Sequence, residues 1–156
     1  KRITIHVSLI EALRQVGYFD EHFFSYQEDI DLAFRLRANG WKAWHAGSAI
    51  AYHDRSIAGN ERSTITDVVI NRRQKSAWAN YFSYRNHLFI LIKDWAAADF
   101  FRYGIFIFWY ELKKFLYILL FEQRSLWAWA EVILKLPRLL RERKKIKPKS
   151  VRGWIH

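Results

Sequence analysis

Residues 17–53 read GYFDEHFFSYQEDIDLAFRLRANGWKAWHAGSAIAYH, and this stretch decides the interpretation of the whole chain. Ser25 and Glu28 have the S-x-x-E spacing of a capping box, in which each residue caps a backbone amide of the first helical turn. Gly40 has the conformational freedom that a helix end requires. The spacing therefore predicts a helix that begins at about Tyr26 and ends at Gly40.

Short alternating segments surround this helix. Residues 41–46 and 49–53 follow it as two short strands, and residues 3–7 alternate as another strand near the start of the chain. Residues 8–16 carry a second capping box and precede Gly17, which predicts a short helix. The order of strand, helix, helix, strand and strand predicts an α/β fold.

Three carboxylates fall in the first turns of the predicted central helix: Glu28, Asp29 and Asp31. The positive end of the helix dipole favours acidic side chains there, and a loop-to-helix junction is a common place for a functional side chain. Spacing alone leaves a plainer alternative, in which all three are ordinary helix-start residues. In that case Glu28 caps Ser25, and Asp31 pairs with Arg35 one turn later.

The same stretch resembles family 2 glycosyltransferases, which are inverting enzymes with a GT-A fold, and in particular their bacterial rhamnosyltransferase-like members. The similarity runs from about Ser8 to His53. The residues that match the family pattern are Gly17, Phe19, Asp20, Glu21, Phe23, Phe24, Tyr26, Glu28, Asp29, Asp31, Leu32, Arg35 or Arg37, Gly40 and His53.

The resemblance implies a reaction and a set of catalytic groups. Asp29 would act as the general base on the acceptor hydroxyl, with Glu28 as a weaker catalytic candidate. His53 would help to hold a divalent metal, Mg²⁺ or Mn²⁺; without the resemblance, it would be read as a surface or core histidine. The substrates would be a nucleotide-sugar donor, with a deoxysugar such as rhamnose, and a glycan or lipid-linked acceptor.

The resemblance also implies substrate contacts from Phe24, Tyr26 and Asp31, which adjoin the catalytic acids. Arg72 and Arg73 lie in a polar segment that would hang near the donor, and guanidinium groups suit a diphosphate. Solvated loop arginines are the plainer alternative for that pair.

The family's nucleotide-binding strands and its upstream D-x-D motif do not precede Gly17 in this sequence. We therefore expect residues 1–56 to be the C-terminal half of a GT-A domain, residues 57–76 an active-site loop or linker, and residues 77–156 an aromatic, basic helical tail. On this interpretation the chain is a fragment that is inactive by itself. Arg85 and Asn86, early in the tail, also resemble a segment that follows the histidine in this family.

Charge divides the chain of 156 residues into two regions. Acidic and basic side chains balance through Arg55, so the net charge of +11 belongs to the remainder. Residues 54–75 are polar and without a sustained period, which predicts a loop with one short ordered turn. The chain has no cysteine, which excludes disulfides and cysteine-based metal sites.

Long helices are predicted after Ser76, over residues 77–93, 95–122 and 126–145, with Asp94 as the N-cap of the second. In that second helix, apolar residues spaced by three and four line one face. They are Phe101, Ile105, Phe108, Leu112, Phe115 and Leu119.

The predicted tail has the composition of helices that lie on a membrane. Charged residues at Glu111, Lys113 and Lys114 interrupt its apolar runs, which argues against a span of about 20 apolar residues. Trp and Tyr side chains together with the basic segment 135–149 are typical of helices at an anionic bilayer surface. We expect a peripheral protein at the cytoplasmic face of the inner membrane. Packing against the catalytic half, or pairing in a dimer, would explain the same periodicity.

Two non-catalytic functions remain as alternatives: a membrane-surface module and a basic module that binds nucleic acid. A pI of about 10.0 with interleaved aromatic residues is consistent with the second. The positive charge lies on helices too apolar to form a solvated groove, so no nucleic acid partner is expected.

Overall fold

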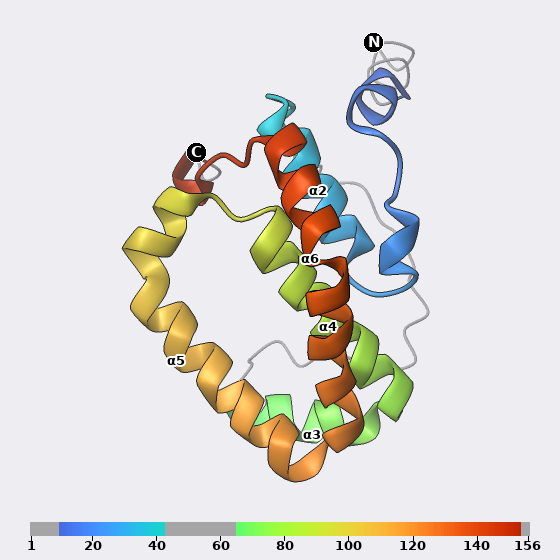
Figure 1. Ribbon diagram of the computed structural model, residues 1–156, viewed down its shortest axis with the longest axis vertical. Helices are drawn as coiled ribbons and strands as arrows, with labels where there is room; N and C mark the ends of the chain where they lie inside the picture. The colour runs from blue at the N-terminus through green and yellow to red at the C-terminus, as the bar shows by residue number, and fades with distance from the viewer. Residues whose placement is uncertain (1–9, 43–64, 154–156) are drawn as a thin grey trace, which may run out of the picture.

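The computed structural model describes residues 10–42 and 65–153, and this part of the chain is built from helices (Figure 1). Residues 10–16 are helical. The elements that follow are η1 (Glu21–Phe23), α2 (Glu28–Ala38), α3 (Ile65–Gln74), α4 (Ala77–Lys93), α5 (Ala97–Phe121), η2 (Gln123–Leu126), α6 (Trp127–Ile146) and η3 (Val151–Gly153).

The predicted α/β fold class is wrong, because no residue of 10–42 or 65–153 belongs to a strand. Most of the short alternating segments lie outside these ranges, and the described residues carry a helical period instead. Trp41, expected to begin a strand, closes α2: its amide donates to the Leu36 carbonyl at 3.0 Å, and the Gly40 amide donates to the Arg37 carbonyl at 3.0 Å. With Gly40 at φ +91°, this is a helix-ending motif, and it confirms the predicted stop.

The long helices predicted after Ser76 are present. α4 spans the predicted residues, and the Ser76 hydroxyl caps it by accepting the Ala79 amide at 3.1 Å. The capping role predicted for Asp94 is wrong, because its amide donates to the Ile90 carbonyl at 2.8 Å and ends α4. α5 begins later, after Ala96, without a side-chain cap.

Residues 65–74 form α3, where a loop was predicted. Two contacts with residues distant in sequence hold the end of this helix. The Arg72 guanidinium pairs with the Glu122 carboxylate, and the Asn80 amide donates to the Arg72 carbonyl at 2.8 Å. A local period could not reveal either contact, so the segment read as a loop. Residues 54–64 lie outside the described ranges.

α4 and α6 lie side by side and enclose the hydrophobic core (Figure 1). Phe23, from η1, is fully buried in this core and meets Phe89 edge to face, with ring centroids 6.0 Å apart. The N-terminal segment is thereby attached to α4. The core consists of Phe23, Tyr84, Leu88, Phe89, Ile90, Ile118, Ala128, Val132 and Leu139.

α5 turns Asp99, Glu111 and Lys114 toward the protein. The Glu111 carboxylate lies 2.6 Å from the His87 ring, and the Lys114 ammonium lies 5.1 Å from the centre of the Tyr84 ring. Burial lowers the pKa of Lys114 to about 8. Of the 25 residues of α5, only Asp99 and Ile118 are buried.

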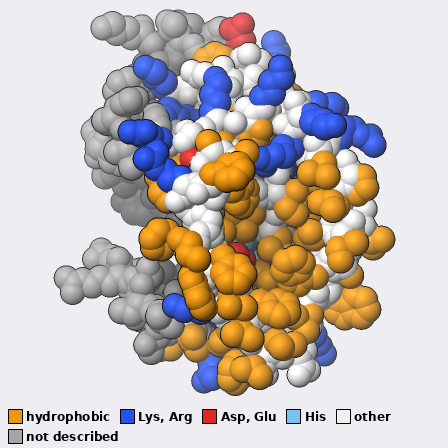
Figure 2. Space-filling model, turned by 60° about the vertical axis from the view of Figure 1, so that its left-hand side comes forward, with side chains coloured by type: hydrophobic (Ala, Val, Ile, Leu, Met, Phe, Trp, Pro, Cys, Tyr) orange, Lys and Arg blue, Asp and Glu red, His pale blue; other side chains and the backbone are white. Residues whose placement is uncertain are grey.

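The predicted apolar stripe of α5 faces outward. Phe101 is 93% exposed, and Ile105, Phe108 and Leu119 are also exposed. Figure 2 shows hydrophobic side chains gathered over this side of the molecule, with Lys and Arg side chains along the upper border. Among the described residues, no helix is both long enough and apolar enough to cross a bilayer.

Candidate active site

The candidate catalytic acids follow a loop with an unusual backbone. Phe24, Tyr26 and Gln27 have φ values of 59°, 70° and 65°, in the left-handed region that non-glycine residues rarely adopt. The left-handed Gln27 is the N-cap of α2, and its side chain makes no capping hydrogen bond. The predicted capping box is therefore wrong, because Gln27 occupies the cap position predicted for Ser25 and α2 begins at Glu28.

The loop makes Glu28 and Asp29 the first residues of α2. Asp29 is exposed, and its Oδ1 accepts the Ile30 amide at 2.9 Å. Glu28 is half-buried, and its Oε2 has no hydrogen-bond partner among the described residues. The two adjacent acids thus differ in access to solvent, and Asp29 is the more accessible of them.

Asp31 points into the protein. It is fully buried, and its Oδ2 accepts the Arg35 Nε at 2.9 Å, which is the pairing that the sequence offered as the alternative to a substrate contact. Asp29 and Asp31 have D-x-D spacing, but residues two apart on a helix do not share a face. The carboxylate of Asp31 is occupied by internal partners, whereas that of Asp29 faces outward.

Lys93 is the second partner of Asp31 and the centre of a buried ion cluster. Lys93 is 1% exposed, and its ammonium lies 2.5 Å from Asp31, 2.8 Å from Asp20 and 3.6 Å from Glu142. Burial would lower the pKa of Lys93, but the surrounding carboxylates raise it above its ordinary value. These contacts join η1, α2, α4 and α6 at one point.

Asp94 lies buried beside this cluster, in surroundings that favour its protonated form. Burial and the negative charge of Asp31 raise the pKa of Asp94 to about 8. Asp20 behaves oppositely: burial would raise its pKa, but Lys93 and Arg138 lower it below the ordinary value. With Asp94 protonated, Lys93, Arg35 and Arg138 balance the three remaining carboxylates, so the cluster carries no uncompensated charge.

Aromatic side chains flank the loop on its outer side. The Phe24 and Trp78 rings meet at 5.6 Å, Trp78 meets Phe82 at 4.6 Å, and Tyr26 meets Trp78 at 6.2 Å. Phe24 is 72% exposed and Trp78 is 48% exposed. The first turns of α4 and the loop before α2 therefore present a shared aromatic surface next to the acids.

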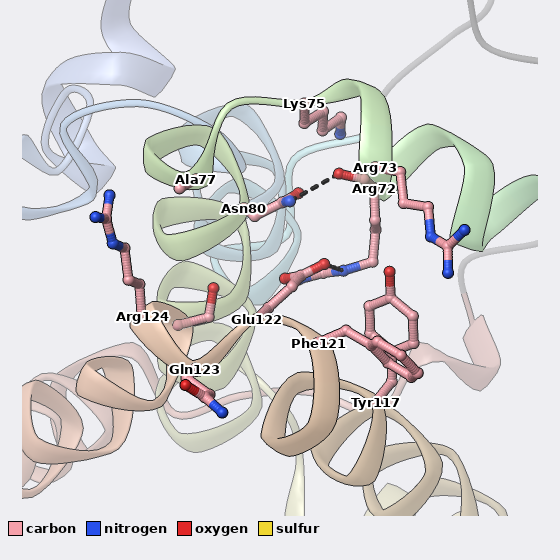
Figure 3. A pocket seen from close by; sticks show the side chains of 11 residues that line it. Arg72, Arg73, Lys75, Ala77, Asn80, Tyr117, Phe121, Glu122, Gln123 and Arg124 are labelled. Atoms are coloured by element: carbon pink, nitrogen blue, oxygen red, sulfur yellow. Dashed lines mark hydrogen bonds and ion pairs between the residues drawn. The ribbon is translucent and has the colours of Figure 1, made fainter.

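A basic cavity of about 510 Å³ lies beside the N-terminus of α4 (Figure 3). Arg72 is paired with Glu122 at its centre, whereas Arg73, Lys75 and Arg124 contribute positive charge around it. The structure thus brings the predicted pair Arg72 and Arg73 into one cavity. The other lining residues are Ala77, Asn80, Tyr117, Phe121, Gln123 and Ser125.

Lys75 lies between this cavity and the loop before α2. It lines the cavity, and its ammonium lies 5.8 Å from the centre of the Tyr26 ring. A ligand in the cavity would therefore lie close to the loop that leads into α2. The predicted substrate residues Tyr26, Arg72 and Arg73 belong to one region of the surface.

The described residues do not form a metal site by themselves. Within 10–42 and 65–153, no group of three or more His, Asp or Glu side chains is arranged to hold a metal ion. The densest carboxylate cluster, around Asp20 and Asp31, already holds the Lys93 ammonium. His53, the predicted metal ligand, lies outside the described residues.

The sequence interpretation missed Lys93 and the partners of Arg85 and Asn86. Lys93 ends an apolar helical run and precedes Asp94, a charged pair in a buried context that could have signalled an internal ion pair. The sequence distinguishes Arg85 and Asn86 only by their resemblance to a segment of the family. In the structure both are buried in α4, 4% and 0% exposed, and both donate hydrogen bonds to the loop before α2.

Comparison with known proteins places most of the chain in one family. The model of "Glycosyl transferase family group 2" matches residues 6–139. No solved structure matches the chain.

Two curated relatives match a shorter segment. Both are described as N-acetylglucosaminyl-diphospho-decaprenol L-rhamnosyltransferase, from Mycobacterium tuberculosis strains CDC 1551 / Oshkosh and ATCC 25618 / H37Rv. Each is 44% identical over 45 residues, which are 29% of this chain and 15% of the relative.

Proposed function

This chain belongs to glycosyl transferase family group 2, and we propose that it contributes Asp29 as the general base of an inverting sugar transfer. One observation carries the choice of Asp29. Of the three acids at the start of α2, Asp29 is exposed, whereas Glu28 is half-buried and Asp31 is fully buried in an ion cluster. An acceptor hydroxyl arriving from solvent can reach the first of these carboxylates most directly.

In the proposed reaction the Asp29 carboxylate accepts the proton of the acceptor hydroxyl. The acceptor oxygen forms a bond to the anomeric carbon from the face opposite the leaving group, which inverts that centre. The bond between the anomeric carbon and the diphosphate oxygen breaks, and its electron pair leaves with the nucleoside diphosphate. Glu28 contributes a second negative charge at the same helix start.

We further propose that the basic cavity attracts the anionic part of a substrate. Arg73, Lys75 and Arg124 supply positive charge around it, and guanidinium groups suit a diphosphate. A divalent Mg²⁺ or Mn²⁺ ion, with His53 among its ligands, would stabilise the negative charge of the leaving group. Within the described residues, only the arginine and lysine side chains support this part of the proposal, because His53 lies outside them.

The acceptor is proposed to be a glycan or a lipid-linked sugar, in contact with the aromatic surface of Phe24, Tyr26 and Trp78. Such a surface offers an apolar face to a sugar ring beside the exposed Asp29. The relatives from Mycobacterium tuberculosis are named as L-rhamnosyltransferases acting on a diphospho-decaprenol lipid. Rhamnose transfer to such an acceptor, in the biosynthesis of an envelope polysaccharide, is the form of the reaction that we propose.

The arrangement of α5 supports a peripheral membrane location. Asp99, Glu111 and Lys114 point into the protein, and most of the large apolar residues of α5 are exposed, as in a helix that lies in a bilayer interface. The last turn of α6 adds the exposed Lys144 and Lys145, which suit anionic lipid. A lipid-linked acceptor would be presented at this surface, and we place the protein at the cytoplasmic face of the inner membrane.

Replacement of the base tests this proposal. In the full-length protein, Asp29→Asn keeps the shape of the side chain but cannot take the proton, so kcat should fall by roughly 10²–10⁴-fold with donor KM nearly unchanged. Glu28→Gln is the matched control and should be milder. Turnover of Asp29→Asn within a few-fold of the unmodified enzyme, or a larger loss in Glu28→Gln, would show that Asp29 is not the base.

A further inference from the structure

The loop before α2 needs support from outside itself. Each of Phe24, Tyr26 and Gln27 has a positive φ, and a non-glycine residue in the left-handed region costs roughly 1 kcal/mol or more. The loop also turns several backbone carbonyls toward α4 instead of toward solvent. Its conformation therefore depends on donors that other elements supply.

Asn86 supplies one of these donors from the middle of α4. Its side-chain nitrogen lies 2.9 Å from the Phe23 carbonyl oxygen, 2.7 Å from that of Ser25 and 2.7 Å from that of Tyr26. Asn86 is fully buried, so no water competes for these contacts. A single amide thus gathers three carbonyls and fixes the curvature of the loop.

Arg85 supplies the second donor and orients the first. Its Nη2 donates to the His22 carbonyl at 2.7 Å and to the Phe23 carbonyl at 3.0 Å. Its Nε donates to the Asn86 Oδ1 at 2.9 Å. Because that oxygen accepts from Arg85, the Asn86 nitrogen must face the loop.

Arg85 is itself fixed by α6. Its Nη1 lies 3.1 Å and 3.2 Å from the two oxygens of Glu131, which also accepts the Tyr81 hydroxyl at 2.5 Å and pairs with Lys135 at 2.5 Å. Burial would raise the pKa of Glu131, but bonds from Lys135 and Tyr81 and the charge of Arg85 lower it to about 2. The carboxylate therefore remains charged at physiological pH and holds Arg85 in place.

We propose that Arg85 and Asn86 are positioning residues of the transferase, which set the direction of the Asp29 carboxylate by holding the loop before α2 with Phe24, Tyr26 and Gln27 at positive φ. This inference rests on the proposed role of Asp29. Position matters for a general base, because a displacement of about 1 Å can cost about 10²-fold in rate. Neither residue needs to touch a substrate in order to act.

The main experiment is Asn86→Asp in the full-length protein, in which acceptor oxygens replace the donor amide and face the loop carbonyls. We expect kcat, corrected for the folded fraction, to fall by about 10- to 100-fold with donor KM within a few-fold. Arg85→Lys is the second variant if the first does not fold. Lysine keeps the positive charge beside Glu131 but lacks the several guanidinium donors that reach Asn86 and the loop carbonyls, so kcat should fall by about 3- to 10-fold.

A structural control separates positioning from a general loss of stability. Arg143→Met removes a side-chain bond of 2.7 Å to the Ile92 carbonyl at the far end of α4. It should lower the melting temperature and leave kcat per folded molecule unchanged. If Asn86→Asp gave the same result as this control, Asn86 would be a structural residue and the inference would be wrong.

Amide hydrogen exchange gives a readout that does not depend on activity. The amides of Phe23, Phe24 and Ser25 are bonded within the loop region, and they should exchange faster in Asn86→Asp while the core of α6 stays protected. Unchanged exchange at these three amides would refute the positioning role, whatever Asp29 does.

A double variant connects the loop to the base. If Asn86 acts through Asp29, then Asp29→Asn with Asn86→Asp should be no slower than Asp29→Asn alone, within about 3-fold. Independent, multiplying losses would show that Asn86 acts by another route. Full activity of Asp29→Asn would instead overturn the proposed function, while the exchange result would still report on the loop.

Discussion

α4 and α5 follow each other in the chain and are both rich in aromatic and aliphatic residues, yet the protein buries them in opposite ways. α4 buries apolar residues together with Arg85, Asn86 and Lys93. α5 buries only Asp99 and Ile118 and exposes most of its aromatic residues. The difference shows that the positions of polar partners, and not apolar content, decide which helix lies at the centre of this fold.

The physical reason is the cost of a buried polar group without a partner. The polar residues of α4 meet carboxylates and carbonyls from four other segments, so the helix can lie at the centre. The polar residues of α5 have fewer such partners: Glu111 meets His87, the C-cap Glu122 meets Arg72, and Asp99 accepts from Ser150 and Val151. Apart from the exposed Arg102 and Lys113, the remaining surface of α5 is mainly apolar, and no element among the described residues covers it.

The largest effect expected from this comparison concerns Lys93. Lys93→Met removes the central cation of a buried cluster and leaves Asp31 and Asp20 undercompensated, so the free energy of unfolding should fall by about 3–5 kcal/mol. The matched control is Lys113→Met on the exposed side of α5, which should change it by less than about 0.5 kcal/mol. Urea denaturation measures both, and equal effects would contradict the contrast between the helices.

A smaller effect concerns pH and Asp94, at the end of α4. Its folded-state pKa of about 8 lies above the ordinary value, so between about pH 4 and pH 8 the folded state keeps a proton that the unfolded state releases. The contribution of Asp94 to stability should therefore decline as pH rises through this window. Asp94→Asn cannot lose a proton, and should be more stable than the unmodified protein at pH 8.5 by about 1–3 kcal/mol.

Thermal melts from pH 5 to pH 8.5 test this prediction. The lowered pKa values of Asp20 and Glu131 affect stability at pH values below this window, and the lowered pKa of Lys114 affects it above about pH 8. A pH dependence that is identical in Asp94→Asn and the unmodified protein would show that Asp94 does not titrate in the window.

The smallest effect on stability is expected on the outer face of α5. Phe101→Asp with Leu120→Asp changes exposed side chains, so the free energy of unfolding should change by less than about 1 kcal/mol. Binding to anionic vesicles, measured by flotation, should fall by at least about tenfold, because each side chain loses its transfer into the interface.

The matched control for α5 is Tyr18→Asp with Phe19→Asp. These side chains are also exposed, and their segment lies across the molecule from α5 (Figure 1). The control should bind anionic vesicles like the unmodified protein, and binding of both should weaken with salt over a screening length of about 8 Å at physiological ionic strength. Equal loss in both double variants would argue against α5 as the membrane contact.

Local spacing predicted several features correctly. The glycine stops at Gly17 and Gly40, with φ values of 73° and 91°, follow from the need for a left-handed residue after a helix. The pairing of Asp31 with Arg35 follows from the geometry of one helical turn. The helix over residues 77–93 follows from its period and its preceding serine. The roles of Asp29 and His53 remain predictions that the structure does not test.

Other features could not be predicted because their causes lie far away in the sequence. The S-x-x-E spacing of Ser25 and Glu28 is a real capping signal, but bonds from Asn86, some 60 residues later, hold the loop in another conformation. The short strand-like segments gave an α/β prediction because a period of two is a weak signal over five or six residues. The described residues instead carry the helical period through most of their length.

The sequence by itself determined that three long helices follow residue 76, with the bounds of α4, and also which acids stand at the start of α2 and the family to which the chain belongs. Those features depend on neighbours within a few residues, so the spacing of residues along the chain predicts them. Only the tertiary structure decided that Asp31 is buried while Asp29 is exposed, that Lys93 is internal, and that α5 turns its apolar face outward. Each of these features depends on which residues, distant in sequence, can pair with a charge or donate a hydrogen bond to a carbonyl. The local pattern of residues does not predict such partners.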